Sequence, residues 1–410
     1  MSPLMQIQEP TDNRKKSSPS WTAFLELGFR PLYLAACAWA VVAIGLWVFL
    51  PSSISAPLPP VYWHAHEMLW GFVGTVAIGF LLTATNNWTG ANPLHGRALG
   101  CLLFLWIIAR VSLLLPYQAS LLIALIANVL FYTTAALAVA RCVLQKRNPQ
   151  NYGFPLLILV MGASSAAYLW QFYQGTDHSL VLQQYATGTL CMASITTLLA
   201  RRVIPFFASR AVEGLDINRH TLTGQWQTGF SALAILCWIF NWPLGAGIFL
   251  CGAGVIALWH LFAWRPWAVR KHPLLWILYA GYAGLALGLL STAAYCFGWI
   301  ATFAIPMHAL AVMGFSILIM GMITRTALGH LGLALRPNRH ILYCYAMVLG
   351  AAILRLAAFI DHRFTTPLIH ISAALWMLAF AIYIYHFFPL LIRPRADAPS
   401  GKPVALKRAP

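Results

Sequence analysis

Residues 63–72 read WHAHEMLWGF and open an apolar run that continues to about Thr85. The stretch places two imidazoles and a carboxylate, those of His64, His66 and Glu67, where water gives way to hydrocarbon. An ionisable group inside a membrane costs about 2.5–3.5 kcal/mol on insertion scales, so each of them needs a partner or a function. The stretch therefore predicts a membrane-spanning helix with a polar site at its beginning.

Small or polar residues recur at every fourth position of this expected helix and form one column along it. The column comprises Glu67, Gly71, Thr75, Gly79 and Thr83. Small residues let helix backbones approach closely in lipid, so we expect the column to face neighbouring helices. His66 lies about 100° round the helix from Glu67, from where it can reach a cleft beside the column.

The composition sets the class of protein. Of the 410 residues, 60% are hydrophobic and only 9% are charged, and a soluble chain of this length would expose far too much apolar surface. The formal net charge of +17 is spread over short segments between apolar runs, so no basic domain offers a nucleic-acid site. The eight cysteines lie in or beside apolar runs without CxxC spacing, which indicates buried free thiols, with a thiolate metal ligand as the alternative.

Twelve apolar runs approximate the ~20 residues that a helix needs to cross a bilayer. They lie at about 32–50, 65–85, 99–115, 120–142, 154–174, 181–200, 226–241, 244–264, 274–297, 303–323, 340–360 and 367–391. The expected fold is an all-α polytopic membrane helix bundle of about 12 transmembrane helices. We expect residues 1–27 to be a disordered cytoplasmic tail, 28–392 the transmembrane bundle, and 393–410 a second cytoplasmic tail.

Lysine and arginine fix the expected orientation. Nearly all of them lie before the first span, in the C-terminal tail or in alternate loops, while the other loops hold only Arg363. By the positive-inside rule both termini are cytoplasmic. The same orientation brings titratable residues of five spans to one depth near the outer face. These are His64, His66 and Glu67 in the second span, Arg110 in the third, His308 in the tenth, Arg355 in the eleventh and His370 in the twelfth.

This set of residues suits a metal or cofactor site. Histidine is the commonest ligand of haem iron and of copper, and arginine pairs with carboxylates such as haem propionates. Two helices with opposed histidines can hold a haem inside a bundle, and His66 and His308 are the best axial candidates. His64 and His370 compete for that role or for copper. The alternative is that each histidine only forms hydrogen bonds between helices.

The Glu67 side chain can have either of two roles. It can orient a ligating imidazole as a hydrogen-bond acceptor, or it can cap the beginning of its helix. Arg110 and Arg355 are the candidates to pair with haem propionates.

Several motifs along the chain resemble those of the NnrS family, a group of haem- and copper-containing bacterial membrane proteins. They are GFRP at 28–31, WHAHEM at 63–68, GFLLTA at 79–84, NWTG at 87–90, RVIPFF at 202–207, HAL at 308–310, Thr324-Arg325, Gly329-His330, Trp376 and RPR at 393–395. The matches extend from about residue 25 to residue 395, nearly the whole chain.

The resemblance implies a twelve-span protein of the bacterial cytoplasmic membrane that binds haem and copper. It further implies a contribution to nitric oxide tolerance and the nitrosative stress response, with nitric oxide or a related small molecule as ligand. The chain departs from the expected family pattern at Tyr279, where a histidine is expected. If the histidine of the family pattern ligates copper, this chain lacks one copper ligand at position 279, and the expectation of bound copper is weaker for it.

Other functions remain open at this stage. A secondary transporter of a small solute or metal ion would use the same His/Arg cluster as its substrate site. A sensor or assembly factor would contact a partner protein through the loop at 201–225. The sequence contains no motif that identifies such a partner. A haem–copper oxidase is excluded because the runs at 181–200 and 226–241 contain no histidine. The residues leave open whether the chain is an enzyme.

Overall fold

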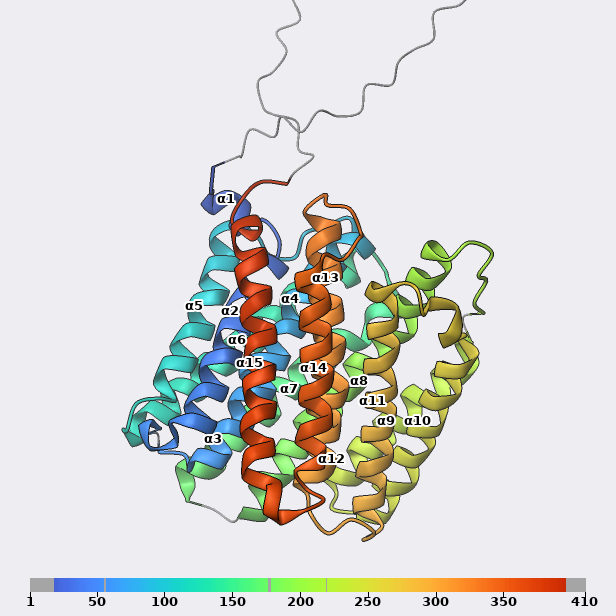
Figure 1. Cartoon of the computed structure of the whole chain (residues 1–410). Coiled ribbons are helices and arrows are strands. Elements are labelled where there is room, and N and C mark those ends of the chain that lie inside the picture. The colour runs from blue at the N-terminus through green and yellow to red at the C-terminus, as the bar shows by residue number, and fades with distance from the viewer. Residues whose placement is uncertain (1–17, 55–56, 176–177, 219, 396–410) are drawn as a thin grey trace, which may run out of the picture.

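A computed structural model describes residues 18–54, 57–175, 178–218 and 220–395 of the chain. The regular secondary structure of these segments is helical, and they contain no strand (Figure 1). The all-α membrane bundle predicted from the sequence is therefore confirmed. The predicted tails fall mostly outside the described residues, although the short helix α1 (Trp21–Phe24) lies within the first of them.

Ten helices of the described segments are long and apolar enough to cross a membrane. They are α2 with η1 (Phe29–Ile44, Gly45–Phe49), α3 with η3 and α4 (Pro60–His66, Glu67–Val73, Gly74–Thr89), α6 (Gln118–Gln145), η4 with α7 (Pro149–Asn151, Gly153–Gln174), α8 (His178–Ala211), α10 (Pro243–Ala263), α11 (Pro273–Cys296), α12 with η6 and α13 (Ala304–His308, Ala309–Ser316, Ile317–His330), α14 (Arg339–Ala357) and η7 with α15 (His362–Phe364, Thr365–Leu391).

Two further helices accompany these ten. They are α5 (Gly96–Ser112) and α9 (Thr221–Ile239), of 17 and 19 residues, and they correspond to the third and seventh predicted spans. Short 3₁₀ turns, η2 (Pro51–Ser53) and η5 (Pro266–Val269), lie in the connections. The count of twelve crossings stays a prediction, as does the side of the membrane on which the termini lie.

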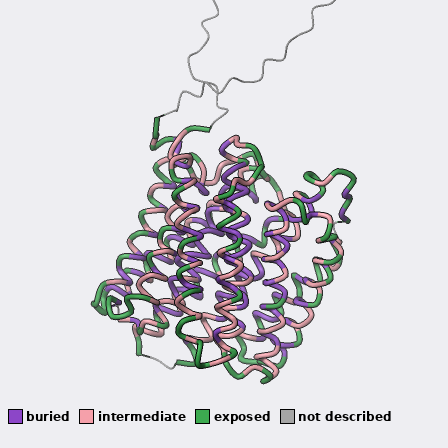
Figure 2. The backbone as a smooth tube through the Cα atoms, viewed as in Figure 1, coloured by how far each residue is buried: buried purple, intermediate pink, exposed green. Residues whose placement is uncertain are grey.

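The long helices run side by side, and the two ends of the bundle differ (Figure 1). Helix α1 and the end of α15 lie at one end, whereas α3 and α12 lie at the other. Buried residues fill the centre and exposed ones lie on the outside (Figure 2). The outer surface is itself apolar, with Phe104 62% and Ile353 68% exposed, which is what a surface in contact with lipid requires.

Glycines set the closest helix contacts in the bundle. Gly281 and Gly288 of α11 lie directly against the helix that contains η6, and a Cβ atom on them would come within 2.7 Å of the Leu318 nitrogen and 2.9 Å of the Leu310 nitrogen. Small residues permit this approach of two backbones, the usual basis of helix packing in lipid. The predicted column from Glu67 to Thr83 is also buried along its whole length. Helix α11 and span ten are therefore held at backbone contact distance.

Three segments of π-helix occur in the described part of the chain, namely η1, η3 and η6. Each inserts one extra residue into a helical turn, an arrangement that is frequent at functional sites. His66 immediately precedes η3, and His308 immediately precedes η6. The two helices that carry the candidate histidines therefore share one order: a short α-helix, a π segment and a long α-helix.

Candidate functional site

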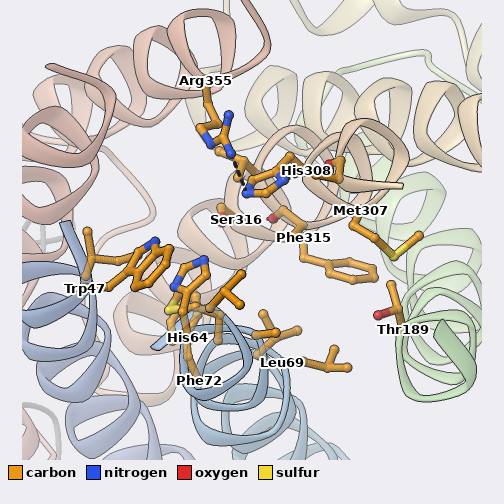
Figure 3. A pocket seen from close by; sticks show the side chains of 18 of the residues that line it. Trp47, His64, Leu69, Phe72, Thr189, Met307, His308, Phe315, Ser316 and Arg355 are labelled. Carbon is orange, nitrogen blue, oxygen red and sulfur yellow. Dashed lines mark hydrogen bonds between the residues drawn. The ribbon is translucent and has the colours of Figure 1, made fainter. Parts of the chain in front are cut away.

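A cavity of about 450 Å³ lies between α2, α3, α8, α12, α14 and α15, toward the end of the bundle that is remote from α1. Its volume falls within the range of small-molecule and cofactor sites. The wall is mainly apolar and aromatic, with Trp47, Phe72, Tyr185, Phe315 and Trp376 among its residues. Figure 3 shows the side chains that point into it.

The π segments build much of this wall. Trp47 belongs to η1, Phe72 to η3, and Phe315 and Ser316 belong to η6. A π turn is wider than an α turn and changes which residues of a helix face a neighbour. The three irregular segments of the described chain thus all contribute to one cavity.

His308 is held in a defined orientation at the cavity wall. Its Nδ1–H donates to the carbonyl oxygen of Ala304 at 2.7 Å, so Nε2 carries the lone pair, a tautomer assigned from the hydrogen-bond partners. That nitrogen accepts a hydrogen bond from Nη2 of Arg355 at 3.0 Å (Figure 3). A backbone carbonyl that fixes Nδ1 is the usual support of an imidazole that binds a metal through Nε2.

His370 and His64 also line the cavity, in different settings. His370 repeats the arrangement of His308, because its Nδ1–H donates to the Thr366 carbonyl oxygen at 2.8 Å. The ring of His64 stacks on Trp47, with the ring centres 5.2 Å apart and the planes at 13°. Its Nδ1 atom is buried and has no hydrogen-bond partner. An unpartnered buried nitrogen is a vacant acceptor or donor position at the wall of the cavity.

Arg355 gives the cavity wall a positive charge. Its guanidinium lies 4.5 Å from the ring centre of Phe359, in addition to its bond to His308. Within the described segments it forms no salt bridge with a carboxylate. A cation in an apolar cavity without a protein counter-ion favours a ligand with an anionic group.

The other three sequence candidates, His66, Glu67 and Arg110, form a separate group beside the cavity. Glu67 accepts hydrogen bonds from Nδ1 of His66 at 2.8 Å and from Nε1 of Trp39 at 2.6 Å. It also pairs with Arg110 at 3.1 Å. Glu67 and His66 are completely buried, and Arg110 is 1% exposed. Paired and hydrogen-bonded in this way, the charges meet the condition for burial in a membrane.

This buried group extends into the neighbouring helices. Nη2 of Arg110 donates to Oδ1 of Asn128 on α6 at 2.8 Å, and Nε2 of His66 lies 3.1 Å from Oγ of Ser165 on α7. Both nitrogens of His66 are therefore engaged, and its side chain is not part of the cavity wall. The structure brings His64, His308, His370 and Arg355 together, and it gathers His66, Glu67 and Arg110 into a second cluster.

Several residues of both groups carry no signal in the sequence. Trp47, Ser165 and Asn128 are ordinary members of apolar runs, and only the packing of helices shows that they meet the candidates. Tyr279, where the family pattern led us to expect histidine, donates its hydroxyl to the Trp264 carbonyl oxygen at 2.8 Å and does not line the cavity. Within the described residues, no group of three or more histidine, cysteine, aspartate or glutamate side chains is arranged to hold a metal ion.

Comparison with known proteins assigns the chain to a family. A search of curated proteins finds no match. The family model described as NnrS protein matches residues 23–395, which include every helix that lines the cavity and both polar groups. The chain is therefore a member of the NnrS family.

Proposed function

We propose that this chain is a haem-binding integral membrane protein of the bacterial cytoplasmic membrane that contributes to nitric oxide tolerance, and that the cavity lined by His64, His308, His370 and Arg355 is its cofactor site. The observation that carries the proposal is the shared setting of His308 and His370. In both, a backbone carbonyl four residues earlier accepts a hydrogen bond from Nδ1–H, so that Nε2 carries the lone pair. Second interactions of this kind are typical of histidines that ligate metals.

The residues of the cavity suit a haem in three respects. The aromatic wall suits a flat apolar macrocycle, the imidazoles of His64 and His308 are suitable iron ligands, and Arg355 can pair with a carboxylate. Bound haem would supply an iron centre that takes up or passes electrons and binds diatomic molecules. The proposal favours His64 over His66 as a ligand, because both nitrogens of His66 already have partners.

Arg355 has a specific task in this proposal. Its bond to Nε2 of His308 occupies the position that a metal would need. A carboxylate is a stronger partner for a guanidinium than a neutral imidazole, because the hydrogen bond is then assisted by both charges. An anionic group in the cavity would therefore draw Arg355 away from His308 and release the imidazole.

Copper is the less supported of the two expected cofactors. Met68 and Met307 line the same cavity, and thioether ligands are of the type that Cu(I) prefers. The described residues nevertheless lack a cluster of three or more histidine, cysteine or carboxylate ligands. Copper binding therefore rests on the family resemblance alone.

The test is the visible spectrum of the purified protein together with its iron and copper content. We expect a Soret band that His308→Ala and His64→Ala diminish, whereas His362→Ala leaves it unchanged. His362 is a suitable control because it is exposed and does not line the cavity. For His66→Ala we expect a lower yield of folded protein with an unchanged ratio of haem to protein. A colourless wild-type preparation without iron would refute the proposal.

Transport of a small solute or metal ion remains a second candidate. It is favoured by the completely buried cluster of Glu67, Arg110 and His66, since ionisable groups inside membrane bundles often mark transport pathways. This function predicts solute accumulation by proteoliposomes that Glu67→Gln abolishes. Absence of uptake of any metal or anion tested, with haem bound in the cavity, would exclude it.

A further inference from the structure

A second, smaller cavity lies beside the first, between α2, α4, α8, α11 and α13. Its volume is about 70 Å³, and its wall includes Ala77, Phe80, Met192, Leu199 and Met322. We propose that it is a docking site for a small uncharged apolar molecule of diatomic size, and that it provides a route from the lipid to the large cavity. The identification of this molecule with the ligand of the cofactor site rests on the proposed function. The docking site itself does not.

The two cavities adjoin one another. Val73 and Phe315 line both of them. Val73 is the last residue of η3, and Phe315 lies near the end of η6. The side chains that separate the two cavities therefore come from the ends of the two π segments. Figure 3 shows the Phe315 ring extending from η6 toward the helix that carries Thr189. The proposed route requires that the side chains of this partition, Val73 and Phe315, move aside.

The wall of the small cavity offers very few partners to a polar ligand. Tyr33 and Thr196 are its only polar lining residues among those described. The Thr196 hydroxyl donates to the Met192 carbonyl oxygen at 2.8 Å, which leaves the buried Tyr33 hydroxyl as the one group without a hydrogen-bond partner. A water molecule in a cavity needs two to four polar partners, and apolar cavities that lack them stay dry and accept apolar atoms or molecules instead. Ions and polar solutes would lose their hydration here without compensation.

The size of the small cavity narrows the class of ligand. An apolar cavity of about 150 Å³ accepts benzene or xenon, and about 10–15 Å³ of such volume suffices for one water-sized probe. A volume of about 70 Å³ lies between these two and matches a diatomic molecule or a single xenon atom. A porphyrin or an organic solute of ordinary size is too large for this cavity.

The far side of the small cavity faces outward. Phe80, Leu199, Val203 and Met322 are partly exposed, whereas Val73 and Phe315 at the partition are buried. Phe80, Leu199 and Met322 belong to three different membrane-spanning helices, so this side opens toward lipid. Uncharged apolar gases concentrate in hydrocarbon relative to water for the same reason that apolar side chains leave water. A lateral opening therefore lies where such a ligand is most abundant.

Xenon is the probe that tests the docking site without any cofactor. Crystals or lipid-embedded samples of the full chain are pressurised with xenon, and a bound atom is expected among Ala77, Phe80, Met192 and Phe315. Ala77→Phe and the milder Ala200→Leu, both at buried positions of the wall, should abolish xenon binding. Ala232→Phe, at an exposed position of α9, should retain it. Absence of xenon from the wild-type cavity, or a lipid chain filling it, would overturn the proposal.

The route is tested separately, by the rate at which carbon monoxide recombines with the haem-loaded protein after flash photolysis. Ala77→Phe and Ala200→Leu are expected to slow bimolecular recombination several-fold without a change in the Soret band. The control variant Ala232→Phe should recombine at the wild-type rate. An unchanged rate in a variant that has lost xenon binding would refute the route. If the wild-type protein lacks haem, the proposed function fails, whereas the xenon result still decides the docking site.

Discussion

A charge inside a membrane bundle is tolerated only when its neighbours replace the water it has lost. Glu67 meets this condition through Arg110, His66 and Trp39, all within hydrogen-bond distance. The four side chains come from four different helices or helix segments, so the group ties span two to α2 and α5. In this arrangement the cluster stabilises the position of η3 beside the cavity.

Removal of Arg110 alone should therefore be costly. Arg110→Met leaves the Glu67 carboxylate buried without a cation, and breaking a buried pair in this way destabilises by about 3–5 kcal/mol. Thermal unfolding of the detergent-purified protein, followed by tryptophan fluorescence, would measure the loss. The double variant Glu67→Gln/Arg110→Met removes both charges and should recover part of it. Equal unfolding temperatures of the single and double variants would show that the unpaired charge of Glu67 is not the cause of the lost stability.

The residue scale also shows what sequence alone could predict. The pattern of basic loops gives the depth of His64, His308, His370 and Arg355, and the structure places all four in one cavity wall. Depth does not tell which side of a helix a residue occupies. His64 and His66 are two positions apart and so differ by about 200° around the axis. Only one of them can face the cavity, and the sequence contains nothing that selects His64.

At the scale of elements, the π segments decide which side chains meet. Apart from the column from Glu67 to Thr83, spans two and ten are apolar on every side, so the sequence pattern does not reveal an extra residue in a turn. This is why the sequence predicts spans two and ten as regular helices, whereas η3 and η6 interrupt them. Phe72 and Phe315 reach the cavity from these segments.

Deletion of Val312 tests the role of η6. Removal of one residue lets a π segment close as an ordinary α-helix, and the helix on either side keeps its orientation because the π turn had absorbed the extra residue. The deletion therefore removes the wide turn from the cavity wall, while His308 stays on its face of the helix and the bundle still folds. We expect a nearly normal thermal transition for this variant, whereas deletion of Ile319, in the regular helix α13, turns the two sides by about 100° and should lower the unfolding temperature strongly. Equal unfolding temperatures of the two deletion variants would contradict the presence of an extra residue in η6.

The contact between α11 and η6 offers a second test at this scale. Gly284 packs directly against the backbone carbonyl of Met313, so a methyl group there must displace η6. Overpacking of a tight contact costs about 1–3 kcal/mol, and Gly284→Ala should lower the unfolding temperature. Gly229→Ala is the matched control, because a Cβ atom at Gly229 meets nothing within 4 Å. Equal unfolding temperatures of the two variants would show that the contact is not tight.

At the scale of the whole molecule, the two ends of the bundle have different chemistry. The basic loops lie at the end that carries α1, whereas the large cavity lies toward the end of α3 and α12 (Figure 1). The sequence could predict this division because it follows from where lysine and arginine fall between apolar runs. It could not predict the volume or lining of the cavity, which depends on helix rotations and on side chains such as Trp47.

Reporter fusions test the predicted orientation. Alkaline phosphatase joined after Trp299, between α11 and α12, should be active because that loop is expected to lie outside the membrane. The same enzyme joined after Leu335, between α13 and α14, should be inactive, and a fluorescent protein at that position should fold. The opposite pattern would reverse the orientation derived from the basic loops.

Whether the cavity of His64 and His308 holds haem is decided most directly by an experimental density map of the protein purified with its own cofactors, in which iron is located by anomalous scattering. We predict one iron inside this cavity, ligated by an imidazole nitrogen of its wall, with Arg355 turned from His308 toward a carboxylate. Iron located at another place in the bundle, or a cavity filled by lipid in an iron-free protein, would contradict the proposed cofactor site.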